Sequence, residues 1–548
     1  MSRPANPQQL ECSNEMTEAS HGNANKASLN ELGMLNKTIS QTAGTVVELR
    51  KNFSAWSVLG LGFSMTNSWF GVSTALVAGI NSGGPVQLVY GLILTMVVAT
   101  AIATSLAELS SAMPHAGGQY YWAAMLASPR YSRGASYVTG WIAWAGSLFT
   151  CASIALGVGN LCLGCIKLAR PDLEIKPWMT FAAYQIINLT CCFFNLLSRL
   201  LPLVTFCTLW ISIISYVAII LAVPISSPKH RPAEWVFTEF INNTGWQSDS
   251  IAYITGLISS NWAFNGLDGA VHMAEEVVNP ERVIPIALLG TVVIGFCTAW
   301  TFAIAMMVSI NDYDSMAATP TGVPILELFQ QALGNRVGSI ALLSLIIITG
   351  CGCLVASHTW QARLCWSFAR DRGLPASALL SQVHQTLQVP LNAHAASCVI
   401  VALLGCLYLV SNTAFNSMAT ACVVLLYLSY SIPVVCLLFR GRSNIDHGPF
   451  WLGQLGLVCN FILLAWLVFA FVVRTSGPPL SSSLEGTVSR DRADWHAKMF
   501  SFPPVYPATA GNMNYVSVVY VVILVIVAIW WVARARTQYR PAMLRSER

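Results

Sequence analysis

Long apolar runs separated by short polar connections fill the chain from about residue 54 onward. A transmembrane helix needs about 20 mostly apolar residues, and the runs predict twelve such helices. An even number places both termini on one side of the membrane. The predicted helices are 54–80, 85–111, 134–163, 178–197, 200–224, 251–274, 284–310, 337–358, 391–410, 414–439, 450–473 and 513–533.

Two of these apolar segments are interrupted near their middle by small and polar residues. The first contains Thr66-Asn67-Ser68 and the sixth contains Asn265-Gly266. A helix broken at membrane depth is tolerated only where the freed backbone lines a cavity or is buried in protein. Breaks at matching positions of two halves indicate a transporter's binding site. The pattern therefore predicts two five-helix repeats, about 54–224 and about 251–439, followed by two helices within about 450–533.

The composition supports a membrane protein. The 548 residues are 55% hydrophobic and 10% charged, with a mean hydropathy of +0.58, whereas soluble domains carry about 25% charged residues. The surface of such a chain must face lipid. The net charge is only +5, and no basic patch is interleaved with aromatic residues, so nucleic-acid binding has no support.

Charge also predicts the topology. Residues 1–47 are polar and lack the apolar core of a signal peptide, so we expect a disordered cytoplasmic tail before a permease domain at 48–535 and a second tail at 536–548. Connections that follow even-numbered helices are richer in arginine, which marks the cytoplasmic side and places both termini there. These arginines are Arg130, Arg133, Arg199, Arg282, Arg363, Arg370, Arg372, Arg440 and Arg442.

Enzyme and metal signatures are weak. Most of the sixteen cysteines lie in apolar runs, where they are read as small packing residues. His272 with Glu275 and Glu276 lacks a second histidine at ligand spacing, so no metal or cofactor is predicted. The chain has no P-loop and no nucleophile–base motif. An enzyme and direct ATP drive are therefore not expected.

Three polar motifs follow the second, sixth and eighth predicted helices, at 107–122, 272–282 and 368–375. They resemble the amino acid–polyamine–organocation (APC) permease superfamily, and within it the fungal amino acid/choline branch with its choline and GABA permeases. The resemblance implies an all-α LeuT-type fold with a 5+5 inverted repeat, broken helices 1 and 6, and proton-driven import at the plasma membrane. Choline or a related small amine is the leading substrate; GABA or an amino acid is the alternative, and a nutrient sensor is less favoured.

The first break carries candidate substrate ligands. Amino-acid members of the superfamily place a Gly-Ser-Gly-like turn where this chain has Thr66, Asn67 and Ser68. Side chains that crowd this turn favour a substrate without an α-carboxylate. The alternative is a polar kink that packs against neighbouring helices.

The second break adds aromatic candidates. Trp262 matches a tryptophan that the bacterial arginine/agmatine antiporter holds over its substrate. A cation over an indole gains roughly 0.5–2 kcal/mol, and Trp69 and Phe264 are further candidates; core or lipid-facing packing is the alternative. The predicted substrate-binding set is Thr66, Asn67, Ser68, Trp69, Trp262, Ala263, Phe264 and Asn265.

Asp268 is the candidate coupling residue. A carboxylate near the bilayer centre costs about 2.5–3.5 kcal/mol and indicates a functional site by default. It would bind a cation or exchange a proton, while a structural hydrogen bond is the alternative and sodium coupling stays open.

Charged residues near the predicted cytoplasmic ends of helices are structural or gate candidates. They are Glu108, Glu275, Glu276 and Arg370. On the opposite side, Asn242-Asn-Thr244 is a weak glycosylation signal in an external loop.

Overall fold

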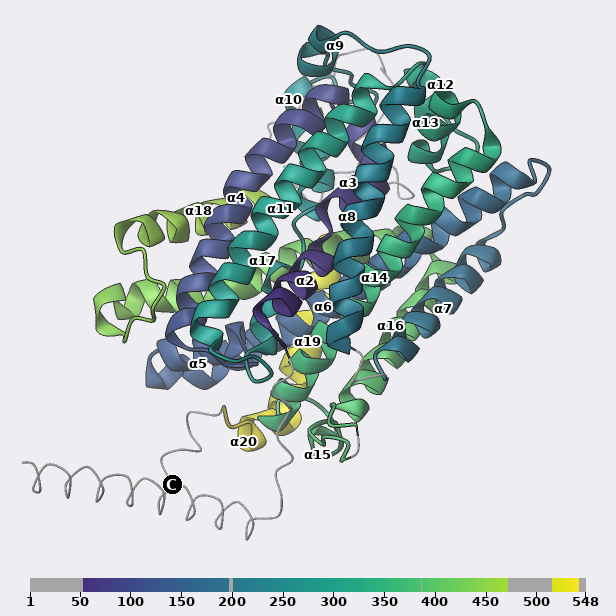
Figure 1. Ribbon diagram of the computed structural model, residues 1–548. Helices are drawn as coiled ribbons and strands as arrows, with labels where there is room; N and C mark the ends of the chain where they lie inside the picture. Colours follow the sequence, from purple (N-terminus) through teal and green to yellow (C-terminus); the bar gives the residue numbers. More distant parts are fainter. Residues whose placement is uncertain (1–52, 197–200, 386, 472–514, 542–548) are drawn as a thin grey trace, which may run out of the picture. The chain divides into compact units, whose positions relative to one another are not determined.

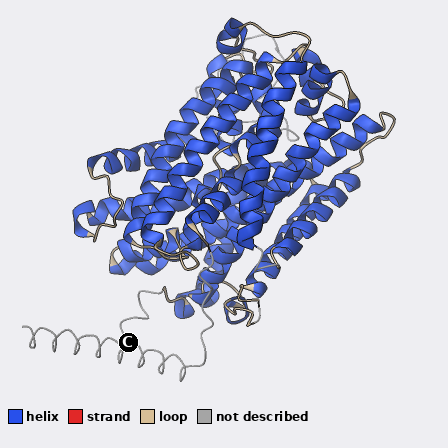
Figure 2. Cartoon of the chain, viewed as in Figure 1, coloured by secondary structure: helices blue, strands red, loops and turns tan. Residues whose placement is uncertain are grey.

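The computed structural model describes residues 53–196, 201–385, 387–471 and 515–541. These residues form helices joined by loops (Figure 2), and the only β-type pairings among them are two isolated bridges, Phe53 with Val277 and Ser82 with Asn242. The predicted tail at 1–47 and the predicted loop residue Arg199 lie outside the described residues.

The first half of the chain folds into long helices with one short helix between them (Figure 1). They are α2 (Ala55–Thr66), α3 (Ser68–Asn81), α4 (Gly84–Ala112), α5 (Gln119–Leu126), α6 (Pro129–Ala169), α7 (Pro177–Phe194) and α8 (Leu201–Ser226).

The second half also contains long helices, with more short helices between them. It contains α9 (Ala233–Thr238), α10 (Asp249–Trp262), the 3₁₀ helix η1 (Leu267–Met273), α11 (Pro280–Val308), α12 (Tyr313–Ala317), α13 (Pro324–Leu333), α14 (Arg336–Arg370), α15 (Ser377–Leu380), α16 (Leu391–Val410) and α17 (Asn412–Arg440). The remaining elements are η2 (Arg442–Asn444), α18 (Gln454–Phe471), α19 (Val516–Trp530), the π-helical η4 (Trp531–Ala535) and α20 (Arg536–Gln538).

Eight described helices are long and apolar enough to cross a bilayer: α4, α6, α8, α11, α14, α16, α17 and the continuous segment through α19 and α20. Their faces differ in burial. The most apolar window of α17 is 67% buried, whereas that of α19 is 17% buried. An apolar side chain that is not covered by protein needs lipid around it, so α19 lies at the periphery and α17 in the interior of the helical bundle.

The predicted interruption of the first segment is confirmed. Asn67 separates α2 from α3 and has φ 33° and ψ 63°, in the left-handed region. Asparagine adopts this conformation more readily than most residues, because its short polar side chain bonds locally. A single residue thus ends one helix and starts the next.

The predicted interruption of the sixth segment is also confirmed. The α-helix α10 ends at Trp262, the chain turns through 263–266, and η1 continues as a tighter 3₁₀ helix. Gly266 has φ 79°, a conformation that glycine adopts without the steric cost of a Cβ atom. The two broken segments pack together, because α2 contacts η1 and α3 contacts α10.

The predicted end of the eighth helix is wrong. The sequence placed it at residue 358 with Arg363 in the following loop, whereas α14 continues to Arg370. The extra turns are almost wholly buried and include Thr359, Gln361 and Arg363. Polar residues continue the helix here because protein partners, and not water, satisfy their hydrogen bonds. Arg363 is therefore part of the packed core.

Candidate functional site

The two breaks lie directly against each other. A Cβ atom added to Gly71, near the start of α3, would lie 3.0 Å from the Cα atom of Ala263. One added to Gly295 of α11 would meet both the Ser68 hydroxyl and, at 3.8 Å, the ring of Phe264. Glycine is required at these points of close approach, and together they bring residues about 195 positions apart into one place.

Helix ends converge on this place with opposite polarity. The helix α3 begins at Ser68 and no side chain caps it, so its N-terminal N–H groups are directed toward the break. The helix α10 ends at Trp262, so its C-terminal carbonyl groups are directed toward the break. Such ends behave like roughly +0.5 and −0.5 elementary charges. The break can therefore hold a polar molecule at one end and a cation at the other.

The side chains of the first break are engaged mainly with other helices. The Trp69 Nε1 atom donates to Ser212 Oγ at 2.9 Å, and Ser212 Oγ in turn donates to Asn67 Oδ1 at 3.2 Å. The Trp69 ring also packs 5.5 Å from the ring of Phe302 and is fully buried. These contacts are those expected if Asn67 and Trp69 pack against neighbouring helices, which is the alternative to substrate binding.

Thr66 and Ser68 differ in their hydrogen bonding. The Thr66 hydroxyl donates within its own helix, to the carbonyl oxygens of Gly62 and Phe63. The buried Ser68 Oγ has no hydrogen-bond partner within the part of the chain that the structure describes. Because a buried polar group without a partner is costly, Ser68 is the residue of this turn best placed to bond a substrate.

The second break contains one side chain that retains accessible surface. Asn265 Nδ2 donates to Thr150 Oγ1 at 3.0 Å, and Phe264 and Ala263 are buried. Trp262 is half-buried, whereas the other seven predicted substrate-binding residues are buried. Trp262 is therefore the one member of the predicted set whose side chain keeps substantial accessible surface.

Asp268 lies just beyond the second break and is completely buried. Its carboxylate accepts hydrogen bonds from three elements. Gln119 Nε2 donates to Oδ2 at 2.7 Å, the Tyr430 hydroxyl donates to Oδ1 at 2.7 Å, and His272 Nε2 lies 3.2 Å from Oδ2. Because α5, η1 and α17 all contribute, the carboxylate joins three separate parts of the bundle.

The contact between Asp268 and His272 needs a shared proton. His272 Nδ1 lies 2.7 Å from the carbonyl oxygen of Ala116, which only accepts, so Nδ1 carries a hydrogen. A hydrogen bond between Nε2 and Oδ2 then requires a proton on one of these two atoms.

Two ion pairs hold the segment after η1 against α14. Arg370 binds Glu275 with two hydrogen bonds of 2.7 and 2.9 Å. Arg363 binds Glu276 with bonds of 2.9 and 3.4 Å, and both of these side chains are almost inaccessible. Neither ion pair was predicted from the sequence. The arrangement fits the predicted gate role of Glu275, Glu276 and Arg370, which stays a prediction.

His115 borders the more exposed of these pairs. Its Nε2 atom lies 3.3 Å from Arg370 Nη2 and 3.9 Å from Glu275 Oε1. Burial lowers the pKa of His115 to about 4, against the opposing pull of Glu275. Burial alone would raise the pKa of Glu275, but the hydrogen bond and charge of Arg370 outweigh it and the pKa falls. At neutral pH, therefore, His115 is uncharged and Glu275 is ionised.

Glu108 anchors a third contact. Its carboxylate lies 2.9 Å from Arg442 Nη2 and accepts the backbone N–H of Leu452 at 2.8 Å. The side chain is buried at the end of α4, and it ties α4 to the connection before α18. This geometry fits the structural role predicted for Glu108.

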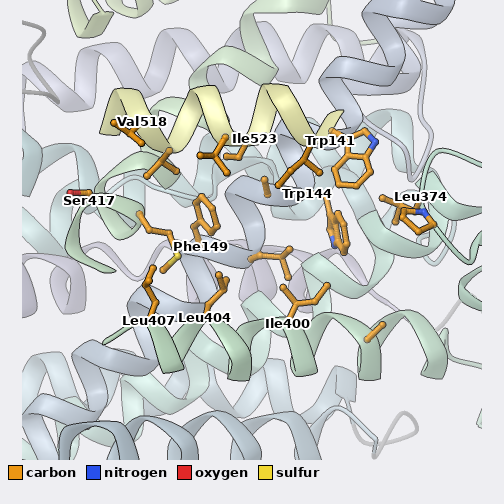
Figure 3. A pocket seen from close by; sticks show the side chains of 18 of the residues that line it. Trp141, Trp144, Phe149, Leu374, Ile400, Leu404, Leu407, Ser417, Val518 and Ile523 are labelled. Atoms are coloured by element: carbon orange, nitrogen blue, oxygen red, sulfur yellow. The ribbon is translucent and has the colours of Figure 1, made fainter. Parts of the chain in front are cut away.

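An apolar cavity lies elsewhere in the bundle. It has a volume of about 1060 Å³ and is lined by residues of α6, α16, α17 and α19, among them Trp144, Leu404 and Ile523 (Figure 3). None of the predicted substrate-binding residues lines it. Its walls are suited to hydrocarbon, and a small polar amine would lose its hydrogen bonds there.

The glycosylation candidate Asn242 is involved in several contacts. Its Nδ2 atom donates to the Trp246 carbonyl oxygen at 2.9 Å and to Asp249 Oδ1 at 3.0 Å. Thr244 of the same sequon is buried. A glycan on Nδ2 would replace one of its two hydrogens and so remove at least one of these bonds; the site stays a prediction.

Sequence reasoning missed Gln119, His272 and Tyr430 as partners of Asp268, and Arg363 as the partner of Glu276. Gln119 lies in one quoted motif and His272 in another, which was a usable signal. Tyr430 lies in an ordinary apolar run, and nothing in the pattern marked it.

The fold and site define a class. An all-helical membrane protein whose first and sixth segments break side by side, next to a buried carboxylate, is a secondary transporter. The chain belongs to the amino acid permease family, whose model matches residues 53–527. It is a multi-pass transporter and not an enzyme.

Several curated relatives cover nearly the whole chain. A choline transporter of Saccharomyces cerevisiae is 48% identical over 90% of this chain and 83% of its own length. A swainsonine transporter of Arthroderma benhamiae is 32% identical, with 90% and 93% covered. A 7-keto 8-aminopelargonic acid transporter of Saccharomyces cerevisiae is 29% identical, also with 90% and 93% covered. All three names describe transporters.

Proposed function

We propose that this protein imports choline or a related small amine across the plasma membrane, with both termini in the cytoplasm. The observation that carries the substrate is the 48% identity to a choline transporter along 90% of the chain. The break geometry agrees with it, since the turn at Thr66-Asn67-Ser68 is crowded by side chains where a carboxylate would need bare backbone.

The cationic head group has a matching environment. The C-terminal end of α10 carries a partial negative charge of roughly half an elementary charge, and Trp262 is its last residue. A quaternary ammonium donates no hydrogen bonds, so an indole face worth roughly 0.5–2 kcal/mol is its natural contact. Ser68, whose hydroxyl has no hydrogen-bond partner among the described residues, would accept a hydrogen bond from the alcohol of choline.

We infer that the coupling ion is a proton held between Asp268 and His272. The 3.2 Å contact is stable only when one proton is shared, because the unprotonated pair would place a lone pair against a carboxylate. When the break opens to one side, water reaches the pair and its proton can exchange. In this mechanism Glu275, Glu276 and Arg370 close the cytoplasmic side.

Uptake of radiolabelled choline in cells that lack their own choline transporter tests this proposal. The expected result is saturable accumulation that rises as the external medium is acidified. Trp262→Ala should raise KM, because the lost cation–π contact of roughly 0.5–2 kcal/mol corresponds to about 2- to 30-fold in affinity. Trp246→Ala, in the external loop before α10, is the matched control and should leave KM unchanged.

GABA or an amino acid is the second candidate substrate. The family is that of amino acid permeases, and two relatives with about 30% identity are named as transporters of other compounds. Competition separates the candidates. If unlabelled choline fails to block uptake whereas GABA or an amino acid does, the substrate assignment fails while the transporter class stands. Ligand binding without any accumulation would instead indicate a sensor.

A further inference from the structure

A second buried cluster, made of residues that the proposed transport cycle does not use, lies among three helices. Cys192 of α7, His358 of α14 and Cys398 of α16 place their ligand atoms within 4.8 Å of one another. The three helices pack on each other in pairs, and the three side chains are buried. From the sequence, both cysteines were read as packing residues because they lie in apolar runs. The cluster joins residues 166 and 206 positions away from Cys192.

We propose that these residues form a binding site for Zn²⁺. In a tetrahedral zinc site with Zn–S near 2.3 Å and Zn–N near 2.05 Å, ligand sulfur and nitrogen atoms lie about 3.6 Å apart. Cys192 Sγ lies 3.5 Å from His358 Nε2, and the ligand atoms of all three residues lie within 4.8 Å of one another. Two thiolates and an imidazole are the ligands zinc prefers.

His394 is placed to supply the fourth ligand. It precedes Cys398 by one helical turn on α16, and its ring nitrogens lie 3.6 Å from Cys398 Sγ. His394 Nε2 donates to the Cys192 carbonyl oxygen at 3.0 Å, which leaves Nδ1 with its lone pair free. A backbone carbonyl that fixes the tautomer in this way is typical of histidines that bind metal.

Gln361 supplies the matching support for His358. Its side-chain amide lies 2.6 Å from His358 Nδ1, and its Oε1 atom has no hydrogen-bond partner among the described residues. Rotating this amide by half a turn lets Oε1 accept from Nδ1–H. That tautomer leaves Nε2, the nitrogen nearest to Cys192, free to bind the ion.

Bound zinc would fix α7, α14 and α16 to one another. These helices lie beside, and not within, the broken segments (Figure 1). The ion would act as a structural clamp on these three helices. This inference does not depend on choline being the substrate.

The test is the metal content of the full-length protein, purified under reducing conditions in lipid nanodiscs and titrated with Zn²⁺ and with Co²⁺. We expect about one ion per chain and, for Co²⁺, a thiolate charge-transfer band typical of cysteine ligation. The double variant Cys192→Ser/Cys398→Ser should lose both signals. The matched control Cys162→Ser/Cys165→Ser removes two thiols of α6 with no histidine in contact and should keep them. Gln361→Leu should weaken zinc affinity about 10- to 100-fold.

A second readout needs no variant. Zn²⁺ should protect Cys192 and Cys398 of the wild-type protein from alkylation, measured peptide by peptide with mass spectrometry, while Cys162 and Cys165 stay reactive. Three results would overturn the proposal: no stoichiometric ion in the wild-type protein, equal ion content in both double variants, or a Cys192–Cys398 disulfide in membranes from which no metal is recovered. Choline uptake is measured separately, so failure of the zinc site leaves the transport proposal intact.

Discussion

Replacing Asp268 with asparagine separates proton coupling from structural hydrogen bonding. Asparagine has the shape of aspartate but holds no exchangeable proton. Its NH₂ group can donate to His272 Nε2, while its oxygen accepts from the Tyr430 hydroxyl. Gln119 Oε1, which has no partner within the described chain, accepts the second amide hydrogen once the Gln119 amide is rotated. All three contacts of the wild-type carboxylate therefore have a replacement.

The magnitudes follow from this exchange. Three hydrogen bonds are lost and three are formed, each worth about 0.5–1.5 kcal/mol net, so we expect Asp268→Asn to change the free energy of unfolding by no more than about 1 kcal/mol. Proton coupling, by contrast, should be lost completely in the variant. A gradient of one pH unit supplies about 1.36 kcal/mol per proton, which corresponds to tenfold accumulation. The wild-type protein should reach that value with one proton per choline, and the variant should only equilibrate choline.

Proteoliposomes with the membrane potential clamped at zero provide the assay. Radiolabelled choline is followed under an imposed pH gradient and, separately, in exchange for internal choline without a gradient. Asp268→Asn should lose gradient-driven accumulation and keep exchange. Accumulation at the wild-type level would refute Asp268 as the coupling residue. A variant that aggregates would instead refute the hydrogen-bond account.

Three further predictions concern packing and pH. Glu276→Gln leaves Arg363 buried without its counter-charge and should destabilise the purified protein by about 3–5 kcal/mol, whereas Glu275→Gln, whose pair is more exposed, should cost about 1 kcal/mol in thermal unfolding. Gly71→Ala should separate the two breaks and reduce the choline uptake rate, because its Cβ would lie 3.0 Å from Ala263 Cα, while Gly157→Ala, with 3.9 Å to its nearest neighbour, should be tolerated. The folded-state pKa of His115, about 4, lies below its ordinary value of 6.5, so stability falls as pH drops below 6.5. Thermal unfolding at pH 7 and pH 5 should show a loss of about 2 kcal/mol that His115→Gln removes.

The two breaks were predictable because small and polar residues inside an apolar run are a local signal. The run around Asn67 and the run around Gly266 both stand out against neighbours that are apolar throughout. Neither residue needs a partner from elsewhere to break its helix. At the first break Asn67 has left-handed backbone angles, and at the second break Gly266 has them.

The partners inside the site were not predictable, because they depend on packing across the bundle. Gln119 and Asp268 are 149 residues apart, and Tyr430 is 162 residues from Asp268. The prediction of where α14 ends was wrong for the same reason. Hydropathy assigned the polar residues near Arg363 to a loop in water, but Glu276, 87 residues away, satisfies Arg363 inside the protein.

The loop between α4 and α5 connects the shared proton to the cytoplasmic ion pairs. The Ala116 carbonyl accepts from His272, and His115 of the same loop contacts Arg370. Gly118 has φ 51°, and a Cβ atom there would lie 3.0 Å from His272 Cε1. We therefore expect loss of the proton proposed for His272 to alter the contact of this ring with the loop and, through the loop, the Arg370–Glu275 pair.

Gly118→Ala tests this connection without touching a titratable group. Alanine is strained at this φ by about 1–2 kcal/mol, and its methyl group would push the His272 ring away from Asp268. We expect exchange of choline to continue while the dependence of uptake on external pH weakens. Gly134→Ala, which has no atom within 4 Å of its added Cβ, is the control. Unchanged pH dependence in Gly118→Ala, in protein that folds and exchanges choline, would mean that the loop does not transmit the state of the proton site to the gate.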